Sequence, residues 1–136
     1  MQQMYENQKL LLRILRQLQD NRRLLVQLRT RSHGCELERI LSSQLQKIMF
    51  LEWEGRQLAL QLGLEIPEPT PGILLPRRYI DSRITARWIA RNQETLSRYQ
   101  RALRRYPNTD SVSIFCRKLI AFSLSVLAQT ERFPDT

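Results

Sequence analysis

The stretch GLEIPEPTPGILLP, residues 63–76, decides how this chain can fold, because it divides the sequence into two halves. It holds four of the six prolines and two of the four glycines, so neither a helix nor a strand is expected to run through it. Shorter turn signals, SHGC at 32–35 and PNTD at 107–110, divide each half again. The runs between these signals have helical periodicity and predict helices at about 3–31, 36–62, 77–106 and 110–133.

Each predicted helix has one apolar face, which the helical period identifies. Leu11, Leu18 and Leu25 recur every seven residues in the first helix. Gly55 lies in the middle of the apolar face of the second helix, where a missing side chain would let another helix approach closely. In the fourth helix, apolar residues cover nearly half the circumference, so this helix is expected to be central or shared with a second subunit. The fold class is therefore all-α, an antiparallel four-helix bundle in a single domain over residues 1–136.

The connection between the second and third helices determines the topology. At roughly 3.1 Å per residue the extended segment 63–76 spans about 40–50 Å, and a helix of 27 residues is roughly 40 Å long. The segment can therefore run the length of the bundle, and its apolar residues indicate that it lies against the helices. This favours a ferritin-like crossover, with a simple up-down-up-down chain as the alternative.

Three polar or sulfur-containing residues fall on or beside the apolar faces. Asn21 shares the apolar arc of the first helix, either as an interior contact that sets the register or, as we favour, at its edge in contact with water. Glu52 is placed at the edge of the second face. Cys116 lies near the apolar face of the fourth helix and is expected to be a small core residue.

Composition excludes several classes of protein. The 136 residues carry a formal net charge of +9 and contain no uncharged apolar run of about 18 residues, so no membrane span is expected. The beginning, MQQMYENQK, is polar and lacks the apolar core of a signal sequence. We therefore expect a cytoplasmic protein whose two cysteines, Cys35 and Cys116, are free thiols.

Residues that could support catalysis or metal binding are scarce. A ferritin-like di-iron site needs Glu-x-x-His on two helices, whereas the single histidine, His33, lies in a predicted turn. Two cysteines and one histidine also fall short of a structural zinc site. His33 and Cys35 could form a reactive thiol pair, but a turn that merely contains both is favoured. We expect no catalytic residue, no bound metal and no cofactor, and hence no enzyme.

The strongest positive signal is a stripe of arginines on the predicted third helix, opposite its apolar side. A basic face of this kind is typical of phosphate binding to DNA or RNA, and it is also the ordinary solvated side of a helix in an arginine-rich protein. We favour the second interpretation and expect at most weak, non-specific nucleic-acid binding. The candidate residues are Arg83, Arg87, Arg98, Arg101 and Arg105.

A second apolar strip runs along the predicted second helix, away from the face that forms the core. Met49, Trp53 and Leu60 lie on it, and one small bundle does not need such a strip. Either another chain covers it or the linker residues Ile73, Leu74 and Leu75 do, and we favour another chain. The predicted function is that of a non-enzymatic helical bundle that acts by self-association or protein–protein interaction, with nucleic-acid binding as the alternative.

The run SRITARWIARNQETLSRYQRALRRYPNTD, residues 82–110, resembles a segment in small uncharacterised helical proteins of anaerobic Gram-positive bacteria. That segment ends in Leu-x-x-[Tyr/Phe]-Pro and an acidic residue, a pattern that Leu103, Tyr106, Pro107 and Asp110 fit. The resemblance extends in segment lengths over most of the chain and implies a bundle distantly similar to ferritin-like, spore-coat-type proteins, without an assigned activity. This sequence departs from it at Arg91 and Thr95, where the family often has small residues, and no site is carried over.

Overall fold

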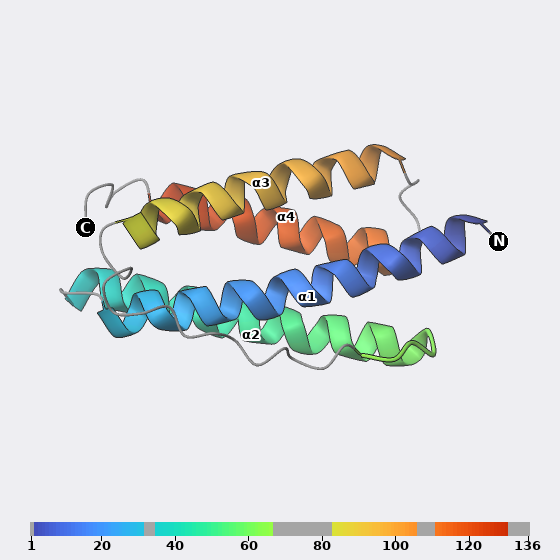
Figure 1. Cartoon of the computed structure of the whole chain (residues 1–136), viewed down its shortest axis with the longest axis horizontal. Coiled ribbons are helices and arrows are strands. Elements are labelled where there is room, and N and C mark those ends of the chain that lie inside the picture. Colours follow the sequence, from blue (N-terminus) through green and yellow to red (C-terminus); the bar gives the residue numbers. More distant parts are fainter. Residues whose placement is uncertain (1, 32–34, 67–82, 106–110, 131–136) are drawn as a thin grey trace.

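The computed structural model describes residues 2–31, 35–66, 83–105 and 111–130, together with all their side chains except those at residues 2–5, 7, 30, 31, 35, 83–85 and 105. The described chain contains four helices and no strand, which confirms the all-α prediction (Figure 1). The helices are α1 (Gln2–Arg31), α2 (Cys35–Gln61), α3 (Arg83–Arg105) and α4 (Ser111–Thr130). The predicted first turns of the third helix and the predicted end of the fourth lie outside the described residues.

The end of α2 is defined by Gly63, which has a positive φ of 72°. Its N–H donates to Leu60 O at 3.0 Å, and the N–H of Leu64 donates to Ala59 O at 2.9 Å. These two bonds form a Schellman motif, in which glycine adopts the left-handed conformation without steric cost. The glycine that opens the proline-rich stretch therefore stops the helix before the first proline is reached.

The four helices lie side by side along one axis (Figure 1). The closest packing joins α1 to α2 and α3 to α4, whereas α2 with α4 and α1 with α3 make looser contacts. The last turn of α2 and the first turn of α3 lie at opposite ends of the bundle, as their green and yellow ribbons show (Figure 1). The short connections thus join close neighbours, and the long one joins distant helix ends.

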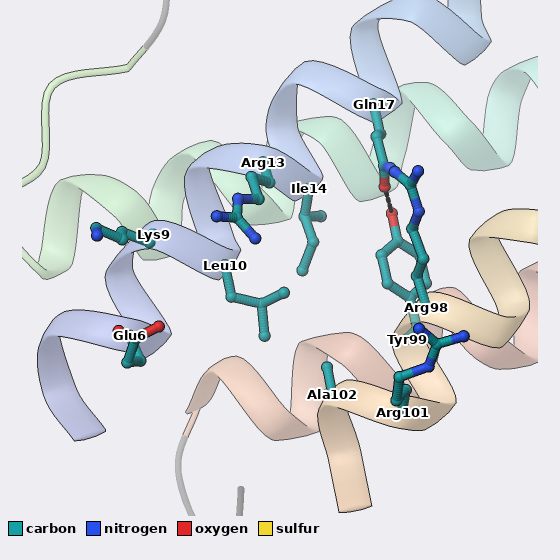
Figure 2. Close-up of a pocket in the computed structure, with 10 residues that line it drawn as sticks. All are labelled: Glu6, Lys9, Leu10, Arg13, Ile14, Gln17, Arg98, Tyr99, Arg101 and Ala102. Atoms are coloured by element: carbon teal, nitrogen blue, oxygen red, sulfur yellow. Dashed lines mark hydrogen bonds between the residues drawn. The ribbon is translucent and has the colours of Figure 1, made fainter. Parts of the chain in front are cut away.

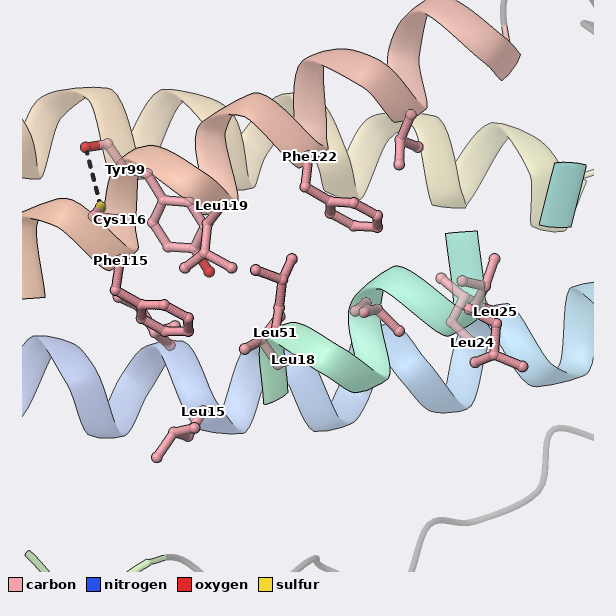
Figure 3. Close-up of a cluster of buried hydrophobic side chains, with 14 of the residues drawn as sticks. Leu15, Leu18, Leu24, Leu25, Leu51, Tyr99, Phe115, Cys116, Leu119 and Phe122 are labelled. Carbon is pink, nitrogen blue, oxygen red and sulfur yellow. Dashed lines mark hydrogen bonds between the residues drawn. The ribbon is translucent and has the colours of Figure 1, made fainter. Parts of the chain in front are cut away.

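The core draws on all four helices (Figure 3). Gly55 lies at its centre, where an added Cβ would sit 2.8 Å from Leu15 Cδ2 and 2.9 Å from Phe115 Cζ. The prediction that this glycine permits a close approach is therefore confirmed. The labelled core side chains of Figure 3 are Leu15, Leu18, Leu24, Leu25, Leu51, Tyr99, Phe115, Cys116, Leu119 and Phe122.

A polar chain crosses the core and joins three helices. The indole N–H of Trp88 donates to Gln44 Oε1 at 3.1 Å, and Gln44 Nε2 donates to Gln129 Oε1 at 3.0 Å. Gln44 and Trp88 are both buried, so these hydrogen bonds satisfy groups that have no access to water. Because α2, α3 and α4 each supply one member, these hydrogen bonds fix the register of the α3–α4 pair against the α1–α2 pair.

Asn21 and Glu52 are buried, at 5% exposure each. The favoured edge position for Asn21 was wrong, because α3 packs across it and the side chain lines a small hollow with Arg91 and Thr95. Glu52 Oε1 accepts a hydrogen bond from Arg56, while Arg22 Nε lies 3.1 Å from Glu52 Oε2 with its N–H not aimed at that oxygen. Two arginine side chains, 33% and 36% exposed, thus balance the charge of the buried carboxylate.

Helix α4 is long and apolar enough to cross a membrane by length and composition, with a mean hydropathy of 1.6 in its best window. Of that window, 44% is buried inside the bundle, and core helices of soluble proteins pass the same test. Arg117 and Lys118 interrupt the apolar run, and Lys118 forms an ion pair with Glu54 of α2. The expectations of no membrane span and of a cytoplasmic location stay predictions.

Candidate functional site

The positive charge of the chain is concentrated on two of the four helices. By sequence, α1 carries seven basic and two acidic residues and α3 carries seven and one, a combined net charge of +11. In contrast, α2 and α4 together carry five basic and four acidic residues, a net charge of +1. Since α1 packs beside α3 and α2 beside α4, the bundle has a strongly basic side and a nearly neutral one.

The α1–α3 groove lies on the basic side and encloses about 330 Å³ (Figure 2). Its apolar floor is formed by Leu10 and Ile14 of α1, which point toward Ala102 of α3. Four cationic side chains line the groove, two from each helix: Lys9, Arg13, Arg98 and Arg101. Among the described residues that line it, Glu6 is the one carboxylate.

A hydrogen bond between α1 and α3 forms one end of the groove. Tyr99 O–H donates to Gln17 Oε1 at 2.8 Å, and the tyrosine ring is buried (Figure 2). Arg98 sits over this bond and donates to Glu94 Oε1 at 2.8 Å within α3. Both partners of that ion pair are exposed, so it adds little stability and leaves Arg98 able to meet another anion.

The arginines predicted from the sequence are only partly brought together. Arg87, Arg98 and Arg101 are exposed on α3, but only the last two line the groove. The side chains of Arg83 and Arg105 lie outside the described residues. Sequence reasoning missed the α1 contribution entirely, because periodicity within one helix carries no information about which helix packs beside it.

The apolar strip predicted on the second helix is exposed, as expected. Met49, Trp53 and Leu60 are exposed by 50%, 57% and 58%, and Phe50 beside them is exposed by 58%. The rings of Phe50 and Trp53 are 6.1 Å apart and tilted by 31°, so they form a contiguous aromatic surface. We call these four residues the α2 strip.

Two shallow hollows of about 450 Å³ each connect the α2 strip to α4. Phe50 lines the first with Ala121 and Phe122, and Trp53 lines the second with Ile114. Between them, Lys118 Nζ lies 3.1 Å from Glu54 Oε2 and 3.3 Å from Oε1. Ile114 was also missed from the sequence, since it lies beside the predicted face of its helix.

Cys116 is buried in the core, which confirms its predicted place. Its thiol donates to Tyr99 O at 3.8 Å, and burial raises the pKa of the thiol to about 11. Burial also raises the pKa of the Tyr99 phenol. Both groups are therefore neutral at physiological pH and poorly placed for nucleophilic chemistry. Within the described ranges no three His, Cys, Asp or Glu side chains gather, and His33 and the side chain of Cys35 lie outside those ranges.

The raised pKa of Cys116 predicts a loss of stability in alkali. Its folded value is above the unfolded one, so the stabilisation is complete below about pH 9 and is lost as the pH rises to about 11. We expect the free energy of unfolding in urea to fall by about 2 kcal/mol more over this range in the wild type than in Cys116→Ala. Equal pH dependence in the two proteins would contradict this assignment.

The resemblance of residues 82–110 to small bacterial helical-bundle proteins stays a prediction. Within the described part of that run, Arg91 is exposed and Thr95 is buried against α1, at the two positions where the sequence departs from the pattern. Tyr106, Pro107 and Asp110 lie outside the described residues. No family model matches the chain, and no match was found among curated proteins or solved structures.

Proposed function

We propose that this chain is an antiparallel four-helix bundle with a ferritin-like crossover, and that it works without catalysis by associating with a second copy of itself through the α2 strip. The observation that carries the proposal is the exposed Phe50–Trp53 pair. Aromatic residues, tryptophan above all, are the favoured anchors of protein interfaces. Self-association would also account for apolar surface that the core of this bundle does not use.

The contacts between helices support the proposed topology. Along α1 and α3, rising residue numbers meet falling ones, since Gln17 bonds Tyr99 and Asn21 lies near Arg91. The same holds for α2 and α4, where Gln44 meets Gln129 and Glu54 meets Lys118. If every neighbouring pair is antiparallel, α2 and α3 run in the same direction, and their connection has to cross the length of the bundle.

Charge and area favour a second copy as the occupant of the α2 strip. Helix α2 has a net charge of −1, so two copies can approach along it without the repulsion that the basic side would produce. With about half of each side chain exposed, the strip and Ile114 offer on the order of 100 Å² each. Two copies would bury about 1,000 Å², the lower limit of a specific interface. A two-fold axis would place the strip against itself.

Trp53→Glu is expected to convert a dimer into a folded monomer, because each two-fold contact would then bury two uncompensated carboxylates. Light scattering reports the mass, and circular dichroism reports the helix content. Leu124→Glu is the matched control: Leu124 is also about half exposed but lies on α4 outside both hollows, so this variant should stay dimeric.

Two results would reject self-association. The first is a wild-type protein that remains monomeric at high micromolar concentration. The second is a Trp53→Glu variant that loses stability without a change in mass, which is the result expected if residues of the same chain cover the strip.

A further inference from the structure

The α1–α3 groove has features that the α2 strip lacks: a high local positive charge, cations on both walls, and an apolar floor below them. We infer that this groove binds the phosphate backbone of a double-stranded nucleic acid. The inference is independent of the proposed self-association, because it uses other helices and other residues.

Arginine dominates the basic side of the bundle. Thirteen of the fourteen basic residues of α1 and α3 are arginines, and Lys9 is the exception. The guanidinium group can donate two parallel hydrogen bonds to one phosphate and stays charged at every physiological pH. The basic side therefore combines a long-range field that attracts a polyanion with side chains that fit its phosphates.

The cations form two rows, one on each wall of the groove. Lys9 and Arg13 are four residues apart on α1, and Arg98 and Arg101 are three apart on α3. The Cβ atoms within each row are therefore about 5–6 Å apart. Packed helices lie about 8–10 Å apart. Because α1 and α3 make looser contacts, their two rows are at least this far apart, which is the same order as the major groove of B-form DNA, about 12 Å wide. Each row can therefore contact the phosphates of one strand.

Among the described side chains, the same side has no exposed aromatic ring and little exposed apolar surface. The described aromatic residues of α3, Trp88 and Tyr99, are buried, so no described ring there is available to stack on an unpaired base. Val26 of α1 is the one large exposed hydrophobic residue among the described side chains of α1 and α3. Insertion into a lipid surface needs apolar side chains that protrude beside the cations. Contact with the phosphates of a duplex backbone is the binding mode that these exposed guanidinium groups fit best.

The test measures binding to a fluorescein-labelled DNA duplex of about 20 base pairs by anisotropy. Each phosphate contact contributes about 0.9 to the slope of log affinity against log salt, so four groove cations predict a slope of about −3.6. Affinity should then fall about 150-fold between about 50 and 200 mM salt. The triple variant Arg13→Gln, Arg98→Gln, Arg101→Gln should retain a slope near −0.9 and fall only about 3-fold.

A matched triple variant removes the same charge from the other side of the bundle: Arg39→Gln, Lys47→Gln and Arg117→Gln, all of them exposed. It should keep the wild-type slope. Equal losses in the two triple variants would mean that net charge alone drives binding, and would overturn the groove assignment. Circular dichroism verifies that both variants are folded.

Further probes distinguish DNA from RNA as the ligand, or reject a nucleic-acid duplex altogether. DNA and RNA duplexes of the same length separate the two nucleic acids, and binding to either supports the inference. Competition by polyglutamate as effective as that by duplex, or equal binding to vesicles of anionic phospholipid, would overturn it. So would a clear preference for single strands or for one base sequence.

Discussion

Replacing Trp88 by alanine is expected to lower the free energy of unfolding by about 4–5 kcal/mol. Trp88 is fully buried, and truncation of a large aromatic side chain in a core costs about 3–5 kcal/mol. The change also removes the indole donor of Gln44 Oε1, which is buried with it. An acceptor left without a donor costs about 1–3 kcal/mol more, less whatever the cavity recovers by admitting water. Urea denaturation followed by circular dichroism measures the loss.

Two companion variants separate the cavity from the hydrogen bond. Trp88→Phe retains most of the apolar volume but not the N–H, so it should lose clearly less than Trp88→Ala. Gln93→Ala, at an exposed position on the same helix, should change stability by less than about 0.5 kcal/mol. If Trp88→Ala is as stable as Gln93→Ala, then Trp88 is not buried beside Gln44 as described.

Gly55→Leu is expected to destabilise the bundle by about 3 kcal/mol through overpacking. The first added atom alone would lie 2.8 Å from Leu15 and 2.9 Å from Phe115, both in the core. Three further carbons would force these side chains off their rotamers or push α1 and α4 away from α2. The gain in helix propensity over glycine, about 1 kcal/mol, offsets only part of that cost.

The controls for this substitution vary size and place separately. Gly55→Ala adds one methyl group, which meets the far ends of two side chains, so its packing cost should be largely offset by the helix propensity it gains. Gln57→Leu adds a leucine at an exposed position two residues away and should be nearly neutral. A Gly55→Leu variant with wild-type stability would contradict the close approach of three helices at this glycine.

Much of the fold could be predicted from the sequence because the periodicity of a helix and the signals that end it lie within or next to its own residues. The bounds of α1 and α2 were placed to within one residue by the turn signals around them, and the outward direction of Trp53 followed from its angle on one helix. The apolar face of α4 likewise correctly placed Cys116 in the core.

What could not be predicted depends on which helices are neighbours. Arg13 and Arg98 are 85 positions apart and line one groove only because α1 packs beside α3. Asn21 looked like an edge residue on α1 alone and is buried once α3 is in place. Gln44 had no visible role, since its partners, Trp88 and Gln129, come from two other helices. Periodicity describes one helix, whereas these features belong to pairs.

The uneven distribution of charge among the helices determines how many nucleic-acid binding surfaces a dimer would carry. The α2 strip and its two hollows share no lining residue with the α1–α3 groove, so association through the α2 strip leaves the groove of each copy uncovered. A dimer of this kind would be bivalent, with two cationic surfaces on one particle. Once one groove has bound a nucleic acid, binding of the second groove to the same molecule would be intramolecular and governed by effective concentration. The apparent affinity of the dimer for nucleic acid would therefore exceed that of a monomer, although no new kind of contact is made. The same particle could hold two separate polymers together, and a monomeric variant with an intact groove would bind one polymer and crosslink none.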